Sequence, residues 1–399
     1  MFDNFLSLEE VDVSGKRVFV RVDYNVPIDE HGAIVDDIRI RETIPTINYL
    51  IDRNAKVILA SHLGRPKGER KPEYSLYPVA KRLERLLDKE VKFTPDCVGE
   101  DVEKMVNSMK EGEVLLLENL RFHQGEEQND PEFAKKLASL ADIYVIDAFG
   151  TCHRKHASMY GIKDFIQPVV MGFLLERELK FFEKALLNPQ RPVIAFIGGS
   201  KVSSKLGVLK HLVERVDKMF IGGAMAFTFI KALGYPVGSS LVEDDMQEEA
   251  LNIIEQAKKL KVKLYLPVDF ICGQAVSEQT PVIEVPWQEI PEGWMGLDIG
   301  HASVVLIKEI LKDAQTIVWN GPMGVFELEK FKRGTFELAH AIANSPALSI
   351  AGGGDTDYAI HKAGVVDEIS YISTGGGAFL ELLEGKMLPC LTAITKKEN

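Results

Sequence analysis

The chain has 399 residues, of which 46% are hydrophobic, and its formal net charge is −12. A chain of this length is long for one hydrophobic core, so we expect two domains of ordinary size. The acidic balance excludes a general binder of nucleic acid or of anionic membranes, because such partners need a basic surface. It does not exclude small anionic ligands, which need only a local cluster of positive charge.

The start of the chain and the cysteines indicate the compartment. The first ten residues, MFDNFLSLEE, contain no basic stretch followed by an apolar one, and no later stretch is apolar for long enough to span a bilayer. The four cysteines lie far apart without a C-x-x-C pair, which argues against a zinc site and a disulfide framework. We therefore expect a cytoplasmic protein with reduced thiols. The cysteines are Cys97, Cys152, Cys272 and Cys390.

Short apolar runs alternate with amphipathic segments along the whole chain. Examples are RVFVRVDYNV, KVILASHLG and IYVIDAFG in the first half and PVIAFIGGS and TIVWNGPMG in the second. Between them lie segments with helical spacing such as SLYPVAKRLERLLDKE. This alternation predicts parallel sheets covered by helices. We expect an α/β protein with two Rossmann-like domains joined by an interdomain helix.

The segment GFLLERELKFFEKALLNPQRP lies between the two halves. Its apolar residues follow helical spacing and Asn188-Pro189 ends the pattern, which predicts a helix from about 173 to 187. We interpret it as the connector between an N-terminal domain, 1–172, and a C-terminal domain, 188–386. On pattern alone it could equally be one more helix that covers a sheet.

Clusters rich in Arg, His and Asp follow four apolar runs of the first half. They are RVDYN (21–25), SHLGRP (61–66), NLRFH (119–123) and DAFGTCHRKH (147–156). The guanidinium group of arginine is a planar fork of donors that matches phosphate and carboxylate oxygens. A single arginine of this kind would be explained by an ordinary ion pair at the surface. Four at successive strand ends favour an anion site, because ligands bind at the carboxyl ends of parallel strands.

His153 and His156 have a spacing that also allows metal binding. The two cationic residues between them would repel a divalent ion, and no acidic ligand follows nearby. The anion site is favoured.

The clusters in the second half are rich in glycine. They are GGSK (198–201), GGA (222–224), GPMG (321–324), GGGDT (352–356) and GGG (375–377). The Walker A spacing is absent. Glycines let backbone N–H groups approach an anion closely, so five such loops indicate a nucleotide laid across a sheet edge. Asp355 suits a magnesium ion shared with phosphates, although capping of a helix explains it nearly as well.

Ten motifs together resemble phosphoglycerate kinase in order and spacing, from about Arg17 to Lys386. They are RVDYNVP, SHLGRPKG, LLLENLRFH, DAFGTCHRKHASM, IGGSKVSSKL, GGAMAFTF, GWMGLDIG, WNGPMGVFE, GGGDT and STGGGAFLELLEGK. The resemblance implies phosphoryl transfer between 1,3-bisphosphoglycerate and ADP, giving 3-phosphoglycerate and ATP, with Mg²⁺. It also implies a monomer that closes like a hinge, with residues 387–399 packed back on the N-terminal domain.

The resemblance also implies the roles of individual residues. The glycerate would be bound by Arg21, Asp23, Asn25, Arg39, His62, Arg65, Arg121 and Arg154. The nucleotide would be bound by Gly199, Lys201, Lys205, Gly222, Gly223, Gly296, Leu297, Asn320, Pro322, Glu327, Gly352, Gly353, Gly354, Asp355 and Thr356, with the metal at Asp355. The catalytic residues would be Arg39, Lys201, Gly353 and Gly376. Lys201 could instead be a phosphate tether in the ground state.

Three residues depart from the family pattern. Asp357 stands where a small residue is usual, His301 where proline is common, and Cys390 where glycine is frequent. None of them is a residue to which we assign chemistry.

Two other classes of protein could share this α/β layout. A nicotinamide-dependent dehydrogenase would show G-x-G-x-x-G after a strand, and this spacing is not found in that context. A hinged binding protein would share the two-lobed layout but would not need glycine-rich loops in addition to arginine clusters.

Overall fold

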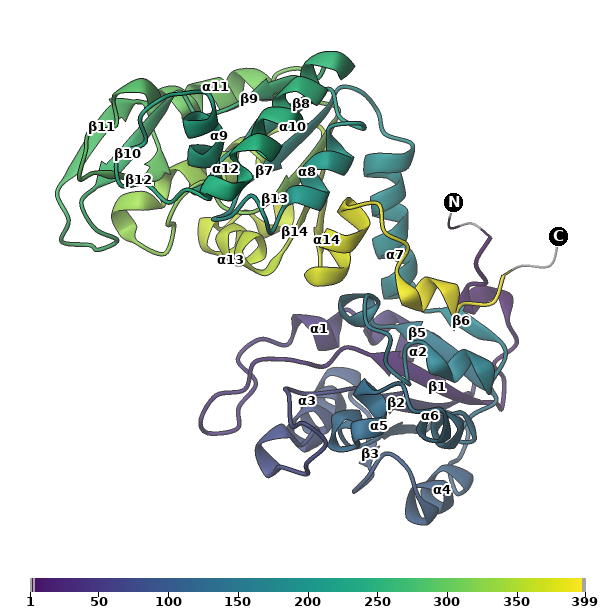
Figure 1. Ribbon diagram of the computed structural model, residues 1–399. Coiled ribbons are helices and arrows are strands. Elements are labelled where there is room, and N and C mark those ends of the chain that lie inside the picture. Colours follow the sequence, from purple (N-terminus) through teal and green to yellow (C-terminus); the bar gives the residue numbers. More distant parts are fainter. Residues whose placement is uncertain (1, 3, 397–399) are drawn as a thin grey trace. The chain divides into compact units, whose positions relative to one another are not determined.

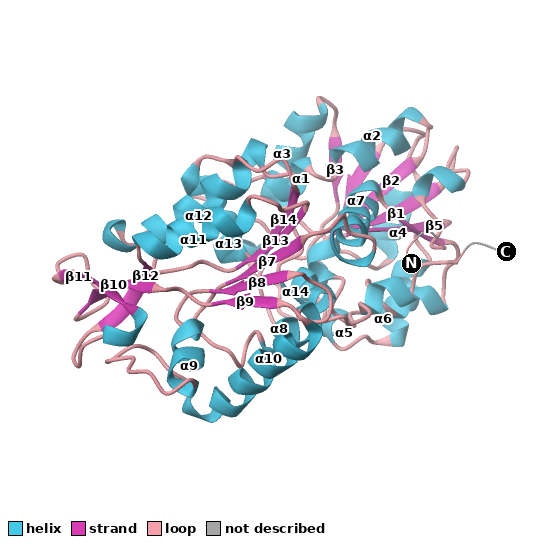
Figure 2. Cartoon of the chain, turned by 90° about the horizontal axis from the view of Figure 1, so that it is seen from above, coloured by secondary structure: helices cyan, strands magenta, loops and turns pink. Residues whose placement is uncertain are grey.

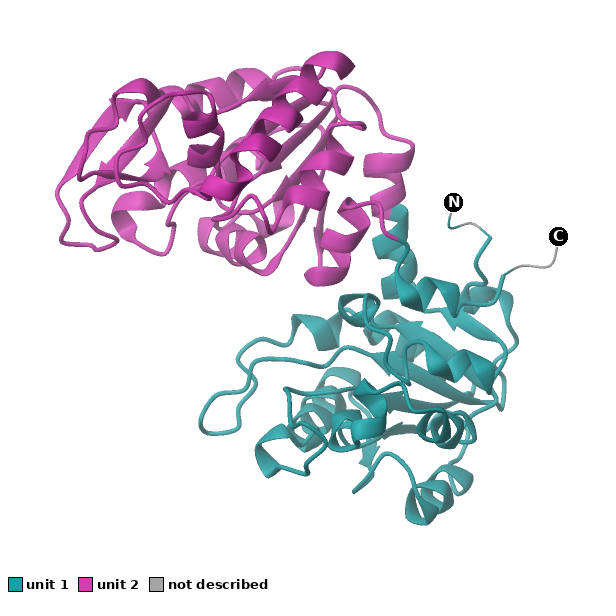
Figure 3. Ribbon diagram, viewed as in Figure 1, with its two compact units in different colours: residues 1–180, 387–399 teal, residues 181–386 magenta. Residues whose placement is uncertain are grey.

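In the computed structural model, which describes residues 2 and 4–396, the chain forms two compact units. Unit 1 comprises residues 1–180 and 387–399, and unit 2 comprises residues 181–386 (Figure 3). The predicted domain limits at 172 and 188 lie on either side of this division and stay a prediction. Among the described helices, none is at once long enough and apolar enough to cross a membrane.

Unit 1 is built on a six-stranded parallel sheet with the order β3-β4-β2-β1-β5-β6 (Figure 1). Its strands are β1 (Arg17–Val22), β2 (Lys56–Ala60), β3 (Val91–Phe93), β4 (Val114–Leu116), β5 (Ile143–Asp147) and β6 (Val169–Met171). Its helices are α1 (Ile38–Arg41), α2 (Ile44–Asp52), α3 (Tyr77–Leu87), α4 (Glu100–Asn107), α5 (Gln124–Glu127) and α6 (Pro131–Ala138).

The core of unit 1 follows the predicted patterns. The central strands β1, β2 and β5 are buried along nearly their whole length, as expected for parallel strands with both faces covered. Helix α3 turns Val79, Ala80 and Leu83 inward, which matches the spacing of apolar residues in its sequence. The predicted α/β class with helix-covered parallel sheets is confirmed.

Unit 2 contains a second six-stranded parallel sheet and a small antiparallel one. Figure 2 shows helices α11, α12 and α13 on one face of the parallel sheet and α8 and α10 on the other. The strands are β7 (Val193–Ile197), β8 (Lys218–Ile221), β9 (Lys263–Tyr265), β10 (Asp269–Gly273), β11 (Val282–Pro286), β12 (Met295–Ile299), β13 (Thr316–Asn320), β14 (Leu348–Gly352) and β15 (Tyr371–Ser373). The helices are α8 (Leu206–Leu212), α9 (Met225–Ala232), α10 (Gln247–Leu260), α11 (His301–Leu311), α12 (Arg333–Ala343), α13 (Gly354–Ala363) and α14 (Gly377–Leu383).

The parallel sheet of unit 2 has the strand order β9-β8-β7-β13-β14-β15, which is the order of a Rossmann fold. The antiparallel sheet, with the order β11-β10-β12, is inserted between β9 and β13. The run KLYLPVDFIC, interpreted from the sequence as one strand, therefore belongs to two sheets. It divides at the segment that contains Pro267, since proline cannot donate a hydrogen bond to a strand ladder.

Helix α7 (Phe173–Phe182) continues as a π-helical turn over Glu183–Leu187, so helical structure extends over the predicted range 173–187. The helix starts in unit 1, where Asp147 at the end of β5 accepts hydrogen bonds from the backbone amides of Leu174 and Leu175 at 2.9 and 3.1 Å. Burial raises the pKa of Asp147 to about 7. Asp147 thus caps α7 and does not join the arginine cluster that follows it in the sequence.

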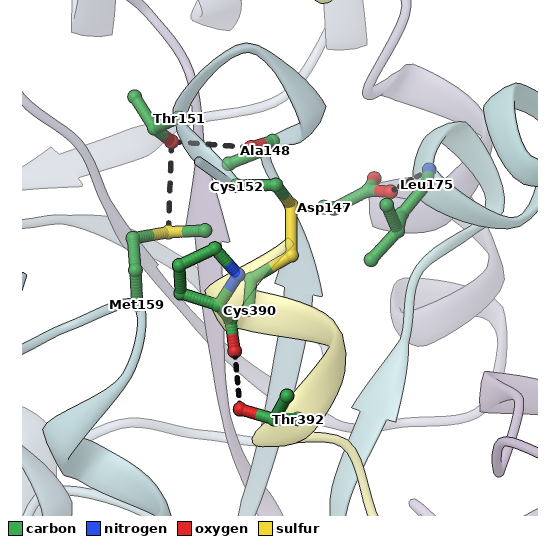
Figure 4. Close-up of a disulfide and its surroundings, with 9 residues drawn as sticks. Asp147, Ala148, Thr151, Cys152, Met159, Leu175, Cys390 and Thr392 are labelled. Atoms are coloured by element: carbon green, nitrogen blue, oxygen red, sulfur yellow. Dashed lines mark hydrogen bonds between the residues drawn. A yellow bond between two sulfur atoms is a disulfide. The ribbon is translucent and has the colours of Figure 1, made fainter. Parts of the chain in front are cut away.

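The expectation of four reduced cysteines was wrong for two of them. Cys152 and Cys390 form a disulfide, with their Cα atoms 4.9 Å apart (Figure 4), whereas Cys97 and Cys272 are free and buried. Because these two cysteines are separated by 238 residues, only the fold brings them together, and spacing alone could not show the pairing. The backbone amide of Cys390 also donates to the carbonyl oxygen of Cys152 at 3.1 Å.

The disulfide lies where the chain returns to unit 1. Leu388, Cys390 and Leu391 are fully buried, and the amide of Thr395 donates to the carbonyl oxygen of Val169 in β6 at 2.8 Å. The segment 387–395 is therefore held by burial and by hydrogen bonds in addition to the covalent link.

We predict that removing the disulfide destabilises the protein without unfolding it. Replacing Cys390 with Ser should lower the free energy of unfolding by roughly 2–4 kcal/mol, because the open chain gains conformational freedom when unfolded. Cys152→Ser should cost a similar amount, and the double variant should cost little more than either, since both changes break the same bond. Denaturation curves measure these values. Thiol titration of the oxidised wild-type chain, unfolded without reductant, should detect only Cys97 and Cys272; detection of four thiols would contradict the pairing.

Candidate active site

Basic side chains gather at one edge of the sheet of unit 1. Strands β4, β2, β1 and β5 are neighbours and run parallel, so their carboxyl ends meet at the same edge. Arg121 follows β4, His62 follows β2, Arg21 lies near the end of β1, and Arg154 comes after β5. The sheet thereby brings the four clusters of the first half together.

Arg21 is the buried centre of this group, and its side chain is 0% exposed. Its Nε donates to Oγ of Ser158 at 2.8 Å, its Nη2 lies 3.3 Å from Nδ1 of His62, and its Nη1 donates to the carbonyl oxygen of Val22. All three side-chain nitrogens of Arg21 already contact protein groups. Arg21 therefore holds the neighbouring side chains in position.

Direct contacts connect four more of the predicted residues. Nη1 of Arg39, on α1, donates to Oδ2 of Asp23 at 2.5 Å. Oδ1 of Asn25 accepts the backbone amide of Gly64 at 2.9 Å, and Nη1 of Arg121 donates to the carbonyl oxygen of the same Gly64 at 2.7 Å. The loops after β1, β2 and β4 are therefore tied to one another.

Several polar groups in this cluster have no hydrogen-bond partner among the described residues. Arg65 and Arg154 are exposed, and among the described residues neither side chain has a hydrogen-bond or ion-pair partner. Nε of Arg121 and the Nδ1 atoms of His153 and His156 are buried and lack a hydrogen-bond partner. Buried polar groups are normally satisfied, so these atoms mark a place for a polar ligand.

The histidines of this group are neutral near neutral pH. Burial, followed by the charge of Arg21, holds the pKa of His62 well below its usual value. Burial and nearby arginines lower the pKa of His153 to about 4 and that of His156 to about 3. The positive charge of the site is therefore carried by arginines, while the histidines can offer neutral hydrogen bonds.

The glycine-rich loops of unit 2 also lie at one sheet edge. They follow β15, β14, β13, β7 and β8, which are neighbours in the parallel sheet. The strand order reverses between β7 and β13, and a crevice forms at such a point in open α/β sheets. At this point the amide of Gly198 donates to the carbonyl oxygen of Asn320 at 2.9 Å.

Asn320 is buried and joins three of these loops. Its Nδ2 donates to the carbonyl oxygen of Gly352 at 2.6 Å, and its Oδ1 accepts a hydrogen bond from Nζ of Lys205. Burial lowers the pKa of Lys205. In the same cluster Oγ1 of Thr356 accepts the amide of Gly321 at 2.7 Å. Gly353 has φ +104°, and a Cβ atom there would lie 2.7 Å from Asn320, so only glycine fits.

The remaining predicted catalytic residues lie at the surface or near it. Lys201 is exposed and, within the described part of the chain, its ammonium has no hydrogen-bond or ion-pair partner. Gly376 immediately precedes α14, and Gly354 begins α13. Lys201 is thus available to a ligand, whereas Lys205 is held by Asn320.

An apolar pocket of about 340 Å³ lies beside these loops. Of the predicted nucleotide-binding residues it is lined by Gly199, Gly223, Gly296, Leu297, Pro322, Glu327 and Asp355. Gly296 is required for close packing, because a Cβ atom there would approach the ring of Phe227 to 2.1 Å. A flat apolar group such as a nucleotide base fits this lining.

The sequence reasoning missed part of both sites. Phe227, Leu241, Val276 and Met295 line the pocket and were not predicted to do so. In unit 1, Glu126 lies beneath the arginines and only the fold brings it there. Two quoted motifs were available signals, because GGAMAFTF contains Phe227 and GWMGLDIG contains Met295.

Each of the three residues that depart from the family pattern has a partner. Oδ1 of Asp357 lies 3.1 Å from Nδ1 of His361, one helical turn further along α13. Nδ1 of His301 lies 2.8 Å from Oε1 of Glu284. Cys390 pairs with Cys152 in the disulfide.

Comparisons with known proteins agree with these features. Residues 8–386 match the family model described as "Phosphoglycerate kinase". "Phosphoglycerate kinase" from Aquifex aeolicus is 68% identical over 392 residues, which is 98% of each chain. That from a Hydrogenobaculum species is 62% identical over 394 residues, covering 99% of this chain and all of its own.

Solved structures give the same result. Phosphoglycerate kinase from Coxiella burnetii matches with a TM-score of 0.90 at 42% identity and covers 98% of each chain. The enzyme from Pyrococcus horikoshii matches with a TM-score of 0.82 at 35% identity, covering 97% of this chain and 98% of its own. The dehydrogenase and binding-protein alternatives are excluded. The chain belongs to the phosphoglycerate kinase family, the phosphotransferases that act on a carboxyl group and transfer a phosphoryl group from 1,3-bisphosphoglycerate to ADP in glycolysis.

Proposed function

We propose that unit 1 binds the glycerate substrate, 3-phosphoglycerate or 1,3-bisphosphoglycerate, through its arginine cluster. The observation that carries this assignment is the set of polar groups without a hydrogen-bond partner among the described residues: Arg65, Arg154, Nε of Arg121 and Nδ1 of His153 and His156. Nε of Arg121 has only an ion-pair contact, to Oε1 of Glu127 at 3.3 Å. Guanidinium forks suit the phosphate and carboxylate of the substrate, and neutral imidazoles suit its hydroxyl group. Asn25, from the loop after β1, and Arg39, from α1, would complete the site.

ADP or ATP would bind in unit 2. The apolar pocket lined by Gly296 and Leu297 fits the adenine base, and Glu327 at its wall would accept from the ribose hydroxyls. The phosphates would follow the glycine-rich loops after β7, β13 and β14, where backbone amides and the N-terminus of α13 favour an anion. Lys201 would contact the phosphates at the reacting end.

Magnesium is the proposed cofactor. Asp355 supplies one carboxylate to the pocket, and Mg²⁺ is usually held by one or two carboxylates together with the phosphates of the substrate. The residues present therefore fit the ion, with Asp355 as its protein ligand. When bound, the ion would reduce the negative charge on the phosphates.

The proposed mechanism is direct in-line transfer without a covalent enzyme intermediate. Phosphoryl transfer needs positioning and neutralisation of charge on the moving group. Arg39 and Lys201 would neutralise this charge, assisted by the backbone amides at Gly353 and Gly376. Closure of the two units around the substrates would exclude water.

The assembly and the compartment stay predictions. We propose a monomer in the cytoplasm, as expected from the sequence. Disulfides are rare in a reducing cytoplasm. The bond between Cys152 and Cys390 therefore requires either an oxidising compartment or protection by burial, and both cysteines are buried.

We predict that Arg65→Ala weakens binding of 3-phosphoglycerate by at least about tenfold, the loss expected for a charge-assisted hydrogen bond. Binding of ADP should stay nearly unchanged, because Arg65 and the apolar pocket belong to different units. Titration calorimetry with each ligand measures both values. Arg85→Ala, which removes an exposed arginine from α3, is the matched control and should change neither. Equal losses for both ligands would refute the assignment of one substrate to each unit.

We predict that Lys201→Ala lowers kcat by roughly 10²- to 10³-fold with smaller changes in either KM, since a donor aimed at the transition state is lost. Lys201→Arg should restore only part of the activity, because a wide planar fork does not replace a compact charge. Lys210→Ala, an exposed lysine on α8 that pairs with Glu249, serves as the control. A raised KM for nucleotide with kcat intact would instead make Lys201 a ground-state tether.

We predict that closure needs both substrates, because each one alone contacts a single unit and has little preference for the closed state. Small-angle scattering should show clear compaction only when 3-phosphoglycerate and nucleotide are bound together. Full compaction with nucleotide alone would contradict the prediction that closure needs both substrates.

A further inference from the structure

A carboxylate lies beneath the arginine cluster and belongs to none of the predicted binding motifs. Glu126, on α5, is 0% exposed. Its Oε1 accepts the hydroxyl of Ser158 at 2.6 Å, and its Oε2 accepts the backbone amide of Ser158 at 3.0 Å. Its own carbonyl oxygen accepts the amide of Ala157 at 2.9 Å. Glu126 therefore fixes the backbone at residues 157 and 158.

The same carboxylate is connected to Arg21. Ser158 Oγ donates to Glu126 and accepts from Nε of Arg21 at 2.8 Å, so the three side chains form a buried chain. Oε1 of Glu126 also lies 3.9 Å from Nη2 of Arg21 and 3.9 Å from Nδ1 of His156. A fully buried guanidinium needs a nearby negative charge, and Glu126 supplies it.

This arrangement sets the geometry of the segment 153–158. That segment carries His153 and His156, whose Nδ1 atoms lack a hydrogen-bond partner, and Arg154, which is exposed. Glu126 holds the end of the segment through Ser158. The hydroxyl of Ser158 also accepts from Arg21, and Arg21 in turn contacts His62. One carboxylate thus orients donors on two different loops.

We propose that Glu126 is a positioning residue for the glycerate substrate, acting through Ser158 and Arg21 without touching the substrate itself. The proposal rests on the assignment of unit 1 as the glycerate site. A residue with this role controls the affinity for one substrate, whereas a residue with only a structural role would change stability and affect both substrates alike.

The test compares Glu126→Gln and Ser158→Ala with the wild-type chain in the direction that consumes 3-phosphoglycerate and ATP. Glu126→Gln keeps the size of the side chain and removes its charge; Ser158→Ala breaks the chain to Arg21 at another point. Each change should raise KM for 3-phosphoglycerate by roughly tenfold, the cost of one hydrogen bond to a charged group, and should leave KM for ATP within about twofold. The double variant should be little worse than either single variant, because both act on the same chain of contacts.

Asp269→Asn is the matched control. Asp269, in unit 2, is also buried, and its carboxylate accepts the hydroxyl of Ser303 at 2.6 Å and the amide of Ser303 at 2.8 Å. It should lower the melting temperature by an amount comparable with Glu126→Gln and leave KM for 3-phosphoglycerate unchanged. Melting temperatures of all variants establish that each one is folded.

The outcomes separate the proposal from the assignment on which it rests. If Arg65→Ala raises KM for 3-phosphoglycerate while folded Glu126→Gln and Ser158→Ala do not, Glu126 is not a positioning residue. If both KM values rise together, or if Asp269→Asn gives the same increase in KM for 3-phosphoglycerate, the role of Glu126 is structural only. If Arg65→Ala also leaves KM for 3-phosphoglycerate unchanged, the glycerate site lies elsewhere and the inference fails with it.

Discussion

Parallel strand pairing is the constraint on which both candidate sites depend. In a parallel sheet every strand ends at the same edge, so polar residues that follow separate strands become neighbours however far apart they lie in the sequence. In unit 1 this pairing brings Arg21, His62, Arg121 and Arg154 together. In unit 2 it brings together glycine-rich loops, which Asn320 then joins. Both units use one geometric rule, and the residues at their strand ends decide which ligand each can bind.

The arginines at one edge of the sheet of unit 1 repel one another, and neighbouring carboxylates and uncharged histidines reduce this repulsion. The chain as a whole is acidic, with a net charge of −12, yet Arg21 is fully buried among other cations. Asp23 pairs with Nη1 of Arg39, Glu126 lies near Arg21, and the low pKa values of His62, His153 and His156 keep these histidines uncharged. Arg65 and Arg154 are exposed and have no ion-pair partner among the described residues, so a bound anion can use their charge.

The sequence predicted most of the architecture because continuous apolar runs and helical spacing are local properties. The strand ends likewise pointed to Arg21, Arg65, Arg121 and Arg154. Arg39 became a candidate only through the family resemblance, since it lies on a short helix and not at a strand end. Glu126 and the pairing of Cys152 with Cys390 were missed, because each depends on contacts between distant segments that no local pattern encodes. The antiparallel sheet of β10, β11 and β12 was missed because one apolar run, KLYLPVDFIC, contains parts of two strands, β9 and β10, that belong to different sheets.

The segment that carries Arg154 shows how an exposed side chain can still be placed accurately. At its start, Cys152 is bonded to Cys390, whose backbone amide also donates to the carbonyl oxygen of Cys152. At its end, Ser158 is fixed by Glu126. With both ends held, few backbone conformations remain for the residues between them, so ordering Arg154 around an anion costs less conformational entropy than it would in a free loop. Cys390, one of the residues that depart from the family pattern, thus fixes the start of this segment through Cys152. The buried carboxylate of Glu126 fixes its end through Ser158.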